Sequence, residues 1–494
     1  MRVIKGRVAY VYLLVLKIIR GLRRRVGKVD TLFSRSVGER VEIFIQREER
    51  GYAGLIYDKM VERLITIGGR FREVRSERFF RTAGFWLLPL ILGIIIGLAV
   101  SLLVYIYELL HHLSLIITSW NSLLILASTV IALLGGYLVV RLLAEKKESG
   151  CGTEFLIEGY HFRNGYISLR DTLSKTLASA ITIGFGGSAG LEGPSLLLGG
   201  GLSSFITRRL KLDQKTVKIL LLSGAAAGFS AIFKAPLTGI LLALEIPYKK
   251  DIETEAFIPA SIASVSAYFT SVIILGTETI FPNPVFAKPT LTTLIQAVLL
   301  GILAAITALA FMKTYETINI ISKQATRRIP TILTTTCAGL ILGIIGLFYP
   351  ETLGLGYDLI HKITLTEPGK IALTNLIALL ILKIITTSIT LNLGGSGGLF
   401  IPSLYVGGVL GLIYATILNL QPTPLYIMSS MAAVMAATNK TLLTSIALVS
   451  ETMGPSYIIP TVISASVSYF LTGNRSFYRS QLESKSNKHE KQNP

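Results

Sequence analysis

Two glycine-rich segments interrupt otherwise apolar sequence, and the first of them carries an acidic residue. Residues 186–200 read GGSAGLEGPSLLLGG, and residues 394–408 read GGSGGLFIPSLYVGG. Glycine permits backbone conformations outside the helical range, and proline near a first turn favours a new helix start. The unpaired amides of a helix N-terminus bind anions without needing a cationic side chain. The two segments therefore predict an anion site of moderate strength, from which the anion can also be released.

Glu192 lies in the first segment, and Phe400 occupies the matching position of the second. A carboxylate inside a membrane is energetically costly and is by default a functional candidate. At the positive end of a helix it can act as a tethered anion that competes with a permeant ion. The alternative is that Glu192 caps its own helix start near the membrane surface.

The two segments belong to an internal repeat. They match at 10 of 15 positions, 208 residues apart, and residues 223–245 match residues 429–451 at 10 of 23 positions with an offset of 206. Two collinear matches indicate two related membrane repeats, 85–280 and 285–473. Transporters built this way hold their substrate at the interface of the repeats. We expect inverted repeats, which requires an odd number of spans in each; an even number would make them parallel.

The composition indicates a membrane protein. The 494 residues are 51% hydrophobic and only 16% charged, whereas about a quarter of the residues of a soluble domain are charged. Residues 85–109 are long enough to cross a bilayer as a helix. Similar apolar runs lie near 122–143, 216–246, 256–276, 291–313, 330–349, 371–391, 397–420 and 424–450. We expect an all-α polytopic fold whose helices are tilted and, at the glycine-rich segments, broken.

The positive charge is concentrated before the first span. Residues 1–81 contain 20 Lys and Arg against 9 Asp and Glu. Because positive residues near spans stay cytoplasmic, both termini are expected inside. We interpret residues 1–84 as a basic segment with short or interfacial helices, and 474–494 as a short tail without a regulatory domain. Anionic lipid head groups suit the basic segment, and no recognition motif points to nucleic acid.

No catalytic or metal-binding pattern accompanies these features. The two cysteines, Cys151 and Cys337, are too few and too far apart for a metal cluster. No nucleophile–base pair or nucleotide loop is present. We therefore expect neither an enzyme nor a cofactor, only a transported ligand.

Taken together, the segments resemble the CLC family of chloride channels and proton/chloride exchangers. The resemblance is carried by GLEGP at 190–194, GSGGLFIPS at 395–403 and, in degraded form, ESGCG at 148–152. It implies transport of chloride or a similar anion across the cell membrane. It also implies a homodimer with one pathway in each subunit.

The resemblance assigns a role to each matching residue. Glu192 would be the gate and the proton acceptor. Backbone amides or side-chain hydroxyls of six further residues would bind the anion, namely Ser149, Leu191, Gly193, Leu399, Phe400 and Tyr478.

One departure from the family pattern bears on mechanism. Exchangers commonly carry two successive acids after the first repeat's APLTGILLALE stretch, and the second acid relays protons from the inside. Here the pair is Glu245 and Ile246. An isoleucine carries no proton, so the sequence slightly favours channel-like behaviour, and Glu245 is interpreted as structural. The alternatives are a proton-coupled exchanger and a fluoride-selective relative; Ser149 and Tyr478 argue against the latter.

Overall fold

The structure is a computed structural model that describes residues 84–278, 281, 290–365 and 367–486. The chain divides into two compact units, Met1–Arg75 and Ser76–Pro494, and the described residues all belong to the second. The short or interfacial helices predicted for the basic N-terminal segment therefore lie outside the described residues.

The described part of the chain is all-α apart from two very short strands, which confirms the predicted fold class. Its first helices are α4 (Gly84–Trp120), α5 (Leu124–Leu143), α6 (Gly152–Phe162), α7 (Leu169–Gly184), α8 (Glu192–Arg209), α9 (Gln214–Phe233), α10 (Pro236–Glu245) and α11 (Phe257–Leu275). They are followed by α12 (Leu291–Arg328), α13 (Thr331–Phe348), α14 (Tyr357–Thr364), α15 (Leu373–Asn392), α16 (Phe400–Ile417), α17 (Thr423–Asn439), α18 (Leu442–Met453) and α19 (Ile458–Leu471). The strands are β1 (Gly150–Cys151) and β2 (Ser396–Gly397), and single 3₁₀ turns occupy Thr254–Ala256, Pro350–Thr352 and Pro455–Tyr457.

Eight helices of the described residues are long and apolar enough to cross a membrane, as a multi-pass protein requires. Two of them extend well beyond the predicted apolar runs. The run predicted at 85–109 lies in α4, which continues to Trp120, and the run at 291–313 lies in α12, which continues to Arg328. In α12 the added turns are polar, because lysine, glutamate and arginine continue a helix as readily as leucine does.

Two apolar runs that looked continuous are each two helices. The run 216–246 divides into α9 and α10 at Lys234, and the run 424–450 divides into α17 and α18 at Lys440. Both lysines have a left-handed backbone, with φ of 53° and 56°. Each Nζ donates to a carbonyl oxygen near the end of a later helix, Lys234 to Glu278 at 2.9 Å and Lys440 to Tyr469 at 2.9 Å. A helix break thus lies at Lys234, and it recurs at the matching Lys440 of the second repeat.

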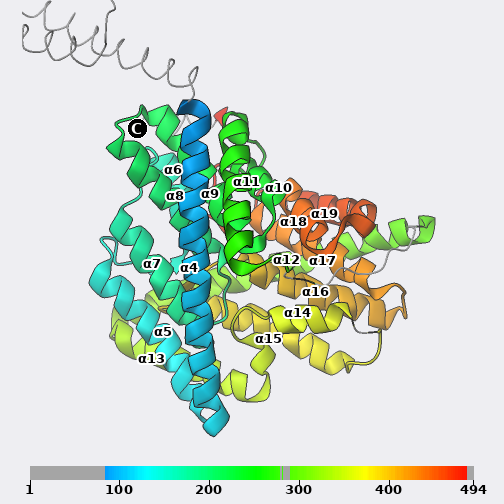
Figure 1. The fold of residues 1–494 in the computed structure, drawn as a ribbon. Coiled ribbons are helices and arrows are strands. Elements are labelled where there is room, and N and C mark those ends of the chain that lie inside the picture. The colour runs from blue at the N-terminus through cyan, green and yellow to red at the C-terminus, as the bar shows by residue number, and fades with distance from the viewer. Residues whose placement is uncertain (1–83, 279–280, 282–289, 366, 487–494) are drawn as a thin grey trace, which may run out of the picture. The chain divides into compact units, whose positions relative to one another are not determined.

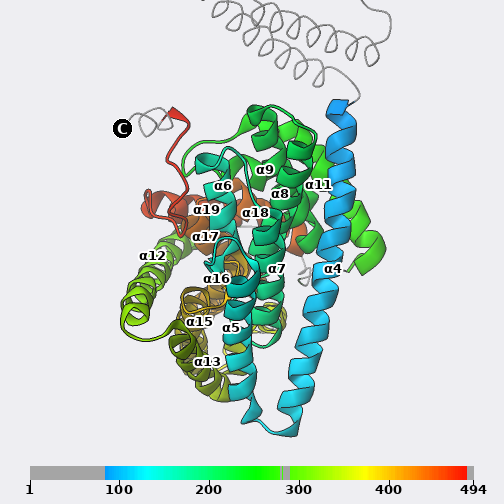
Figure 2. The same ribbon diagram turned by 90° about the vertical axis from the view of Figure 1, so that its left-hand side faces the viewer.

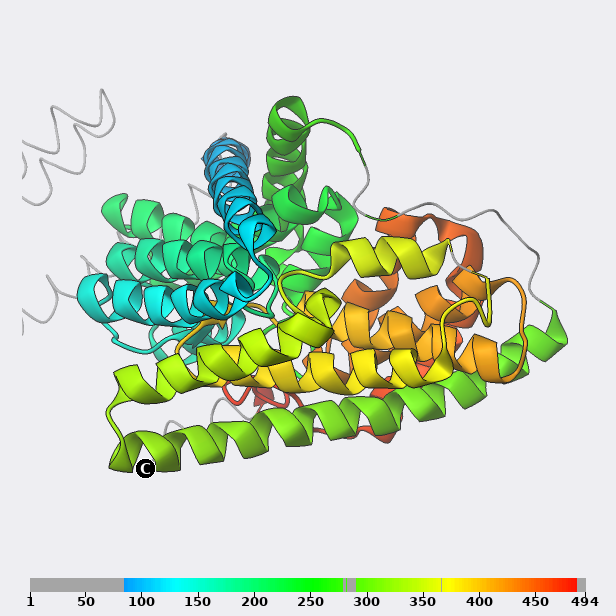
Figure 3. The same ribbon diagram turned by 90° about the horizontal axis from the view of Figure 1, so that it is seen from below.

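The central helices are buried and the outer ones present apolar side chains outward. Helices α8 and α9 pack against each other, as do α16 and α17, and nearly all residues of α9 are buried. The long α4 runs beside α11 and α9 (Figure 1) and descends next to α5 (Figure 2). The long α12 runs along α15, α17 and α19 at one edge of the molecule (Figure 3). This arrangement places the starts of α8 and α16 in the interior.

Candidate functional site

Three helix starts meet in the interior, those of α6, α8 and α16. Strand β1, just before α6, pairs in parallel with β2, just before α16. Gly190, just before α8, exchanges two backbone hydrogen bonds with Gly398, at 3.0 and 2.8 Å. The N-terminal ends of three helices therefore converge, and their dipoles make this region favourable for negative charge.

Glycine makes this close approach possible. A Cβ on Gly193 would lie 2.8 Å from the Cα of Gly398, and one on Gly152 would lie 2.6 Å from the carbonyl oxygen of Gly193. Both distances are shorter than a carbon atom tolerates against backbone. The glycines that mark the repeated segments in the sequence thus bring the helix starts into contact.

The Glu192 side chain reaches from the start of α8 to the start of α16. It is fully buried. Its Oε1 accepts hydrogen bonds from the amides of Phe400 at 2.8 Å and Ile401 at 3.3 Å. Its Oε2 has no hydrogen-bond partner among the described residues. The alternative in which Glu192 caps its own helix near the surface is therefore wrong: the carboxylate binds the N-terminus of a helix from the other repeat.

Several of the residues expected to bind the anion lie near this carboxylate in the chain. Leu191 and Gly193 flank Glu192 at the start of α8, and Leu399 is the residue before α16. The Phe400 amide, which the resemblance assigns to the anion, donates to the Glu192 carboxylate in this structure. Ile401 was not predicted, although it carries the next unpaired amide of the same first turn.

The inner part of the site contains Tyr478 and, farther from the core, Ser149. Tyr478 is buried, and its hydroxyl donates to Oδ1 of Asn439 at 2.6 Å. Its ring centroid lies 6.4 Å from that of Phe400. Ser149 directly precedes β1, is partly exposed, and makes no hydrogen bond among the described residues. The structure thus brings Tyr478 to Phe400, and Asn439 is a partner that sequence reasoning missed.

The segment after α19 folds back into the protein as far as residue 482. The Phe477 amide donates to the Thr438 carbonyl at 3.0 Å, and Gln481 Nε2 donates to the carbonyls of Ile246 and Tyr248, each at 3.2 Å. These contacts hold Tyr478 in place. They also bury Ile246 completely.

Two matching glutamates, one in each repeat, reach into the opposite repeat. Glu245, at the end of α10, accepts from the amides of Leu443 and Thr444 at the start of α18, both at 2.8 Å. Glu451, in the last turns of α18, accepts from the amides of Leu237 and Thr238 at the start of α10, at 3.0 and 2.8 Å. Each carboxylate thus caps the helix start of the other repeat. This geometry agrees with the interpretation of Glu245 as structural.

Lys383 is a buried cation that the sequence analysis did not single out. It lies in α15, is fully buried, and its Nζ donates to the carbonyls of Thr352 at 3.1 Å and Gly354 at 3.0 Å. The charged group that acts on it electrostatically is Glu192. A single lysine inside the apolar run 371–391 was the available signal, because ionisable residues in spans are rarely incidental.

The titratable groups of the site do not form a metal centre. Within the described ranges no group of three or more His, Cys, Asp or Glu side chains is arranged to hold a metal ion.

Outside the spans, the Lys485 amide donates to the Asp251 carboxylate at 3.0 Å and lowers the pKa of that carboxyl.

The fold and the site together define a polytopic membrane transport protein with an anion-compatible interior. Residues 130–473 match the family model described as voltage gated chloride channel. The chain therefore belongs to the CLC family of chloride channels and transporters, whose members are not enzymes.

Several characterised and uncharacterised proteins are similar to this chain. An uncharacterized protein of Methanocaldococcus jannaschii is 29% identical over 65% of this chain and 80% of its own length. The H⁺/Cl⁻ exchange transporter ClcA of Vibrio vulnificus is 30% identical over 57% of this chain and 62% of its own length. A putative chloride channel protein, ClcB-like, of Ralstonia nicotianae is 27% identical over 67% of this chain and 79% of its own length.

Solved structures share the fold. A CLC-type fluoride/proton antiporter superposes with a TM-score of 0.72 at 22% identity, covering 82% of this chain and 99% of that one. A slow cyanobacterial Cl⁻/H⁺ antiporter superposes with a TM-score of 0.71 at 22% identity, covering 80% of this chain and 96% of that one. CLC-type anion transport is the function that family and fold support.

Proposed function

We propose that this protein moves chloride, or a similar small anion, along a pathway that Glu192 gates. The observation that carries the proposal is the buried Glu192 carboxylate bound to the amides of Phe400 and Ile401. Those amides are the donors that an anion would use. An ionised Glu192 and a permeant anion therefore compete for one set of donors.

The same geometry accounts for release of the anion. At this position the donors are backbone amides, whose attraction for an anion is weaker than that of a directly bound cation. Lys383 contributes positive charge to the region while its own hydrogen bonds go to carbonyl groups. Movement of the Glu192 side chain away from α16 leaves the amides free for the next ion.

We propose further that movement of the anion is not coupled to protons. Ile246 is buried and apolar, and the Glu245 carboxylate beside it is occupied by two amides of α18 and by the Thr444 hydroxyl at 2.7 Å. A carboxylate held by three donors is a poor proton carrier, because protonation would break those bonds. The 245–246 pair therefore offers no inner proton relay.

Proton-coupled exchange is the second candidate, and one structural feature favours it. Glu154 lies in the first turn of α6, beside the site, and is partly buried. Its Oε1 accepts from the amide and the hydroxyl of Ser480 at 2.9 and 2.7 Å, while its Oε2 has no partner among the described residues. That free oxygen could take up a proton on the inner side. The similarity to a relative named as an H⁺/Cl⁻ exchanger agrees with this candidate.

The test uses the full-length protein reconstituted into liposomes. Reversal potentials are measured under opposed chloride and pH gradients, with fluoride replacing chloride in a parallel series. Uncoupled conduction gives a reversal potential set by chloride alone. Proton uptake driven uphill by chloride would establish exchange, and a Glu154→Gln variant would then show whether Glu154 carries the proton.

The gate itself is tested by Glu192→Ala, with the exposed Glu367→Gln as a matched control. We expect the Ala variant to keep anion flux and to lose the pH dependence of that flux, because the competing carboxylate is gone. The control should behave as the wild type. If flux disappears in a Glu192→Ala protein that remains folded, the gate assignment is wrong.

The placement of the protein in the cell completes the proposal. We place it in the cell membrane with both termini cytoplasmic, on the basis of the positive charge in residues 1–81. We also propose a homodimer with one pathway in each subunit, an assembly that membership of the family supports. Single-molecule photobleaching of labelled protein in bilayers would show one bleaching step instead of two if the dimer is wrong.

A further inference from the structure

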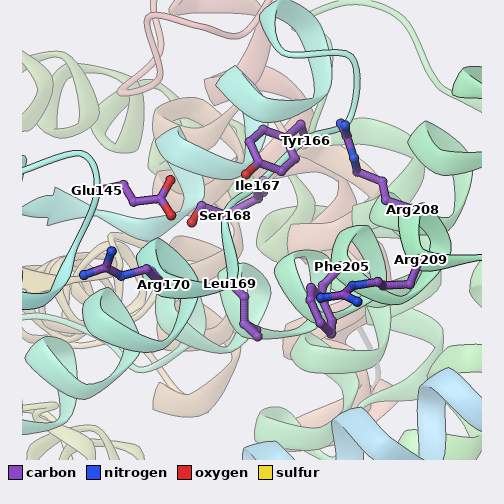
Figure 4. A pocket seen from close by; sticks show the side chains of 9 residues that line it. All are labelled: Glu145, Tyr166, Ile167, Ser168, Leu169, Arg170, Phe205, Arg208 and Arg209. Atoms are coloured by element: carbon purple, nitrogen blue, oxygen red, sulfur yellow. The ribbon is translucent and has the colours of Figure 1, made fainter.

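A basic hollow lies away from the anion site, where three helix ends meet. It has a volume of about 410 Å³ and lies between the end of α5, the start of α7 and the end of α8. Its lining residues are Glu145, Tyr166, Ile167, Ser168, Leu169, Arg170, Phe205, Arg208 and Arg209. Figure 4 shows Arg170 on one side of the hollow and Arg208 and Arg209 across from it.

The arginines of the hollow are not used in ion pairs. Three arginines and one carboxylate, that of Glu145, line the hollow, and none of the three arginines forms a salt bridge within the part of the chain that the structure describes. Two of them are held by aromatic rings instead. Arg208 lies 4.4 Å from the ring centroid of Tyr166, and Arg209 lies 5.3 Å from that of Phe205. Stacking on an aromatic ring orders a guanidinium and leaves its N–H groups available.

Ser168 adds an uncharged hydrogen-bond donor, its hydroxyl, to the lining of the hollow. It is the residue before α7 and only 5% exposed, and its side chain makes no capping hydrogen bond. Its hydroxyl has no partner among the described residues, and the residue lines the hollow. A hydroxyl that lines a hollow and has no protein partner is available as a donor to a ligand or to water. The start of α7 beside it contributes unpaired amides and the positive end of a helix dipole.

We propose that this hollow binds a phosphate group. Arginine forks match the oxygens of phosphate in pairs, and a hydroxyl at a helix start completes a tetrahedral set of donors. Three positive charges against one negative charge leave the hollow electrostatically attractive to a dianion or monoanion. The acidic Glu192 site is not involved, so this inference is independent of the proposed function.

The surroundings indicate that a membrane lipid carries the phosphate. Leu169 lines the hollow, and Leu173 and Leu177 follow it at helical spacing on the same face of α7. Leu173 and Leu177 are 51% and 38% exposed. A lipid bound by its phosphate would therefore find an apolar path for an acyl chain that leads directly away from the arginines. Basic pockets between membrane helices recognise anionic head groups in this way.

The membrane face follows from the chain path. Consecutive spans α4 and α5 run in opposite directions, so α5 returns toward the side where α4 begins (Figure 2). Residues 1–81, which precede α4 in the sequence, carry the excess of positive charge, so the charge rule makes the side where α4 begins cytoplasmic. The ligand is thus expected to be an anionic phospholipid of the cytoplasmic leaflet.

Native mass spectrometry of the full-length protein, titrated with phosphatidylglycerol or with phosphatidylcholine, tests this inference. Arg208→Gln/Arg209→Gln is compared with Arg327→Gln/Arg328→Gln, an exposed arginine pair in the last turn of α12. We expect phosphatidylglycerol to bind about thirtyfold more weakly to the first variant, because each of the two lost arginines contributes about 1 kcal/mol, and unchanged to the second. Ser168→Ala should weaken binding to a smaller extent.

Three results would overturn the proposal. Equal retention of phosphatidylglycerol by the Arg208/Arg209 variant and the wild type would show that the hollow is not the site. Equal affinity of the wild type for both lipids would exclude recognition of the anionic head group. Inorganic phosphate that displaces no lipid, yet itself protects Arg208 from modification by an arginine reagent, would show a soluble phosphate ligand and refute the lipid.

Discussion

The position of the Glu192 carboxylate can be tested by filling the space it occupies. Gly190 lies two residues before it, and a Cβ built on Gly190 would meet Oε2 at 1.8 Å and Oε1 at 2.4 Å. The three atoms nearest to that Cβ all belong to the Glu192 side chain. Gly190 is not among the glycines with positive φ, so alanine fits the backbone at this position. A Gly190→Ala substitution therefore displaces the gate and little else.

The size of the displacement follows from these distances. Ordinary contact begins at 3.4 Å, so Oε2 must retreat by roughly 1.6 Å and Oε1 by roughly 1 Å. The bond from the Phe400 amide, now 2.8 Å, would then exceed hydrogen-bonding distance. A hydrogen bond to a charged group contributes about 1.5–3 kcal/mol. Its loss shifts the gate toward the displaced position by roughly 10- to 100-fold.

Chloride efflux from liposomes at two pH values, together with chloride binding by calorimetry, measures the consequence. We expect Gly190→Ala to raise efflux near neutral pH, to flatten its pH dependence and to bind chloride more tightly. Gly408→Ala is the matched control, because its Cβ would meet only flexible side-chain atoms, of Ile363 at 3.3 Å and Met431 at 3.5 Å. Wild-type efflux, pH dependence and chloride affinity in a folded Gly190→Ala protein would refute the reasoning.

Three further predictions concern titratable groups inside and outside the spans. Glu245→Gln should lower the free energy of unfolding by about 2–3 kcal/mol, because a buried carboxylate loses charge-assisted bonds. The same change at the partly exposed Glu451 should lower it by less. Equal thermal unfolding of the two variants in detergent would contradict this. Lys383→Met should weaken chloride binding about fivefold, through the loss of about 1 kcal/mol of attraction; unchanged calorimetric affinity would exclude that role. The Lys485 amide lowers the pKa of Asp251, so this carboxylate stabilises the fold above its unfolded pKa and the contribution is lost as the pH falls through the folded value. Asp251→Asn should therefore remove a small part, at most about 1 kcal/mol, of the acid sensitivity of unfolding, and an unchanged profile would refute it.

Much of the fold could be predicted because membrane burial leaves a strong mark on sequence. Apolar runs located most of the spans, and the glycine-rich segments located the starts of α8 and α16. The short buried helices were harder: α7 was not expected as a span, and its sequence LRDTLSKTLASAITIG is rich in polar residues. Such a helix is shielded by its neighbours and does not need to be apolar throughout.

The candidate site was predicted in part. The sequence indicated Glu192 and the amide of Phe400, whereas Ile401, Asn439 and Lys383 emerged only from the structure. These residues act through neighbours that are distant in the chain, such as the Tyr478 hydroxyl on Asn439. No local spacing encodes such a pair.

By itself the sequence determined the membrane class, the family, the repeated glycine-rich helix starts and the acidic residue in one of them. These properties depend on residue type and local spacing. Hydropathy follows directly from residue type, and the positions of glycine show where the backbone can leave helical geometry. Only the tertiary structure decided where the carboxylate goes. Glu192 begins α8 but binds the amides of α16, 208 residues away in the chain, because glycine at Gly193 and Gly398 lets the two helix starts approach closely enough to share one anion.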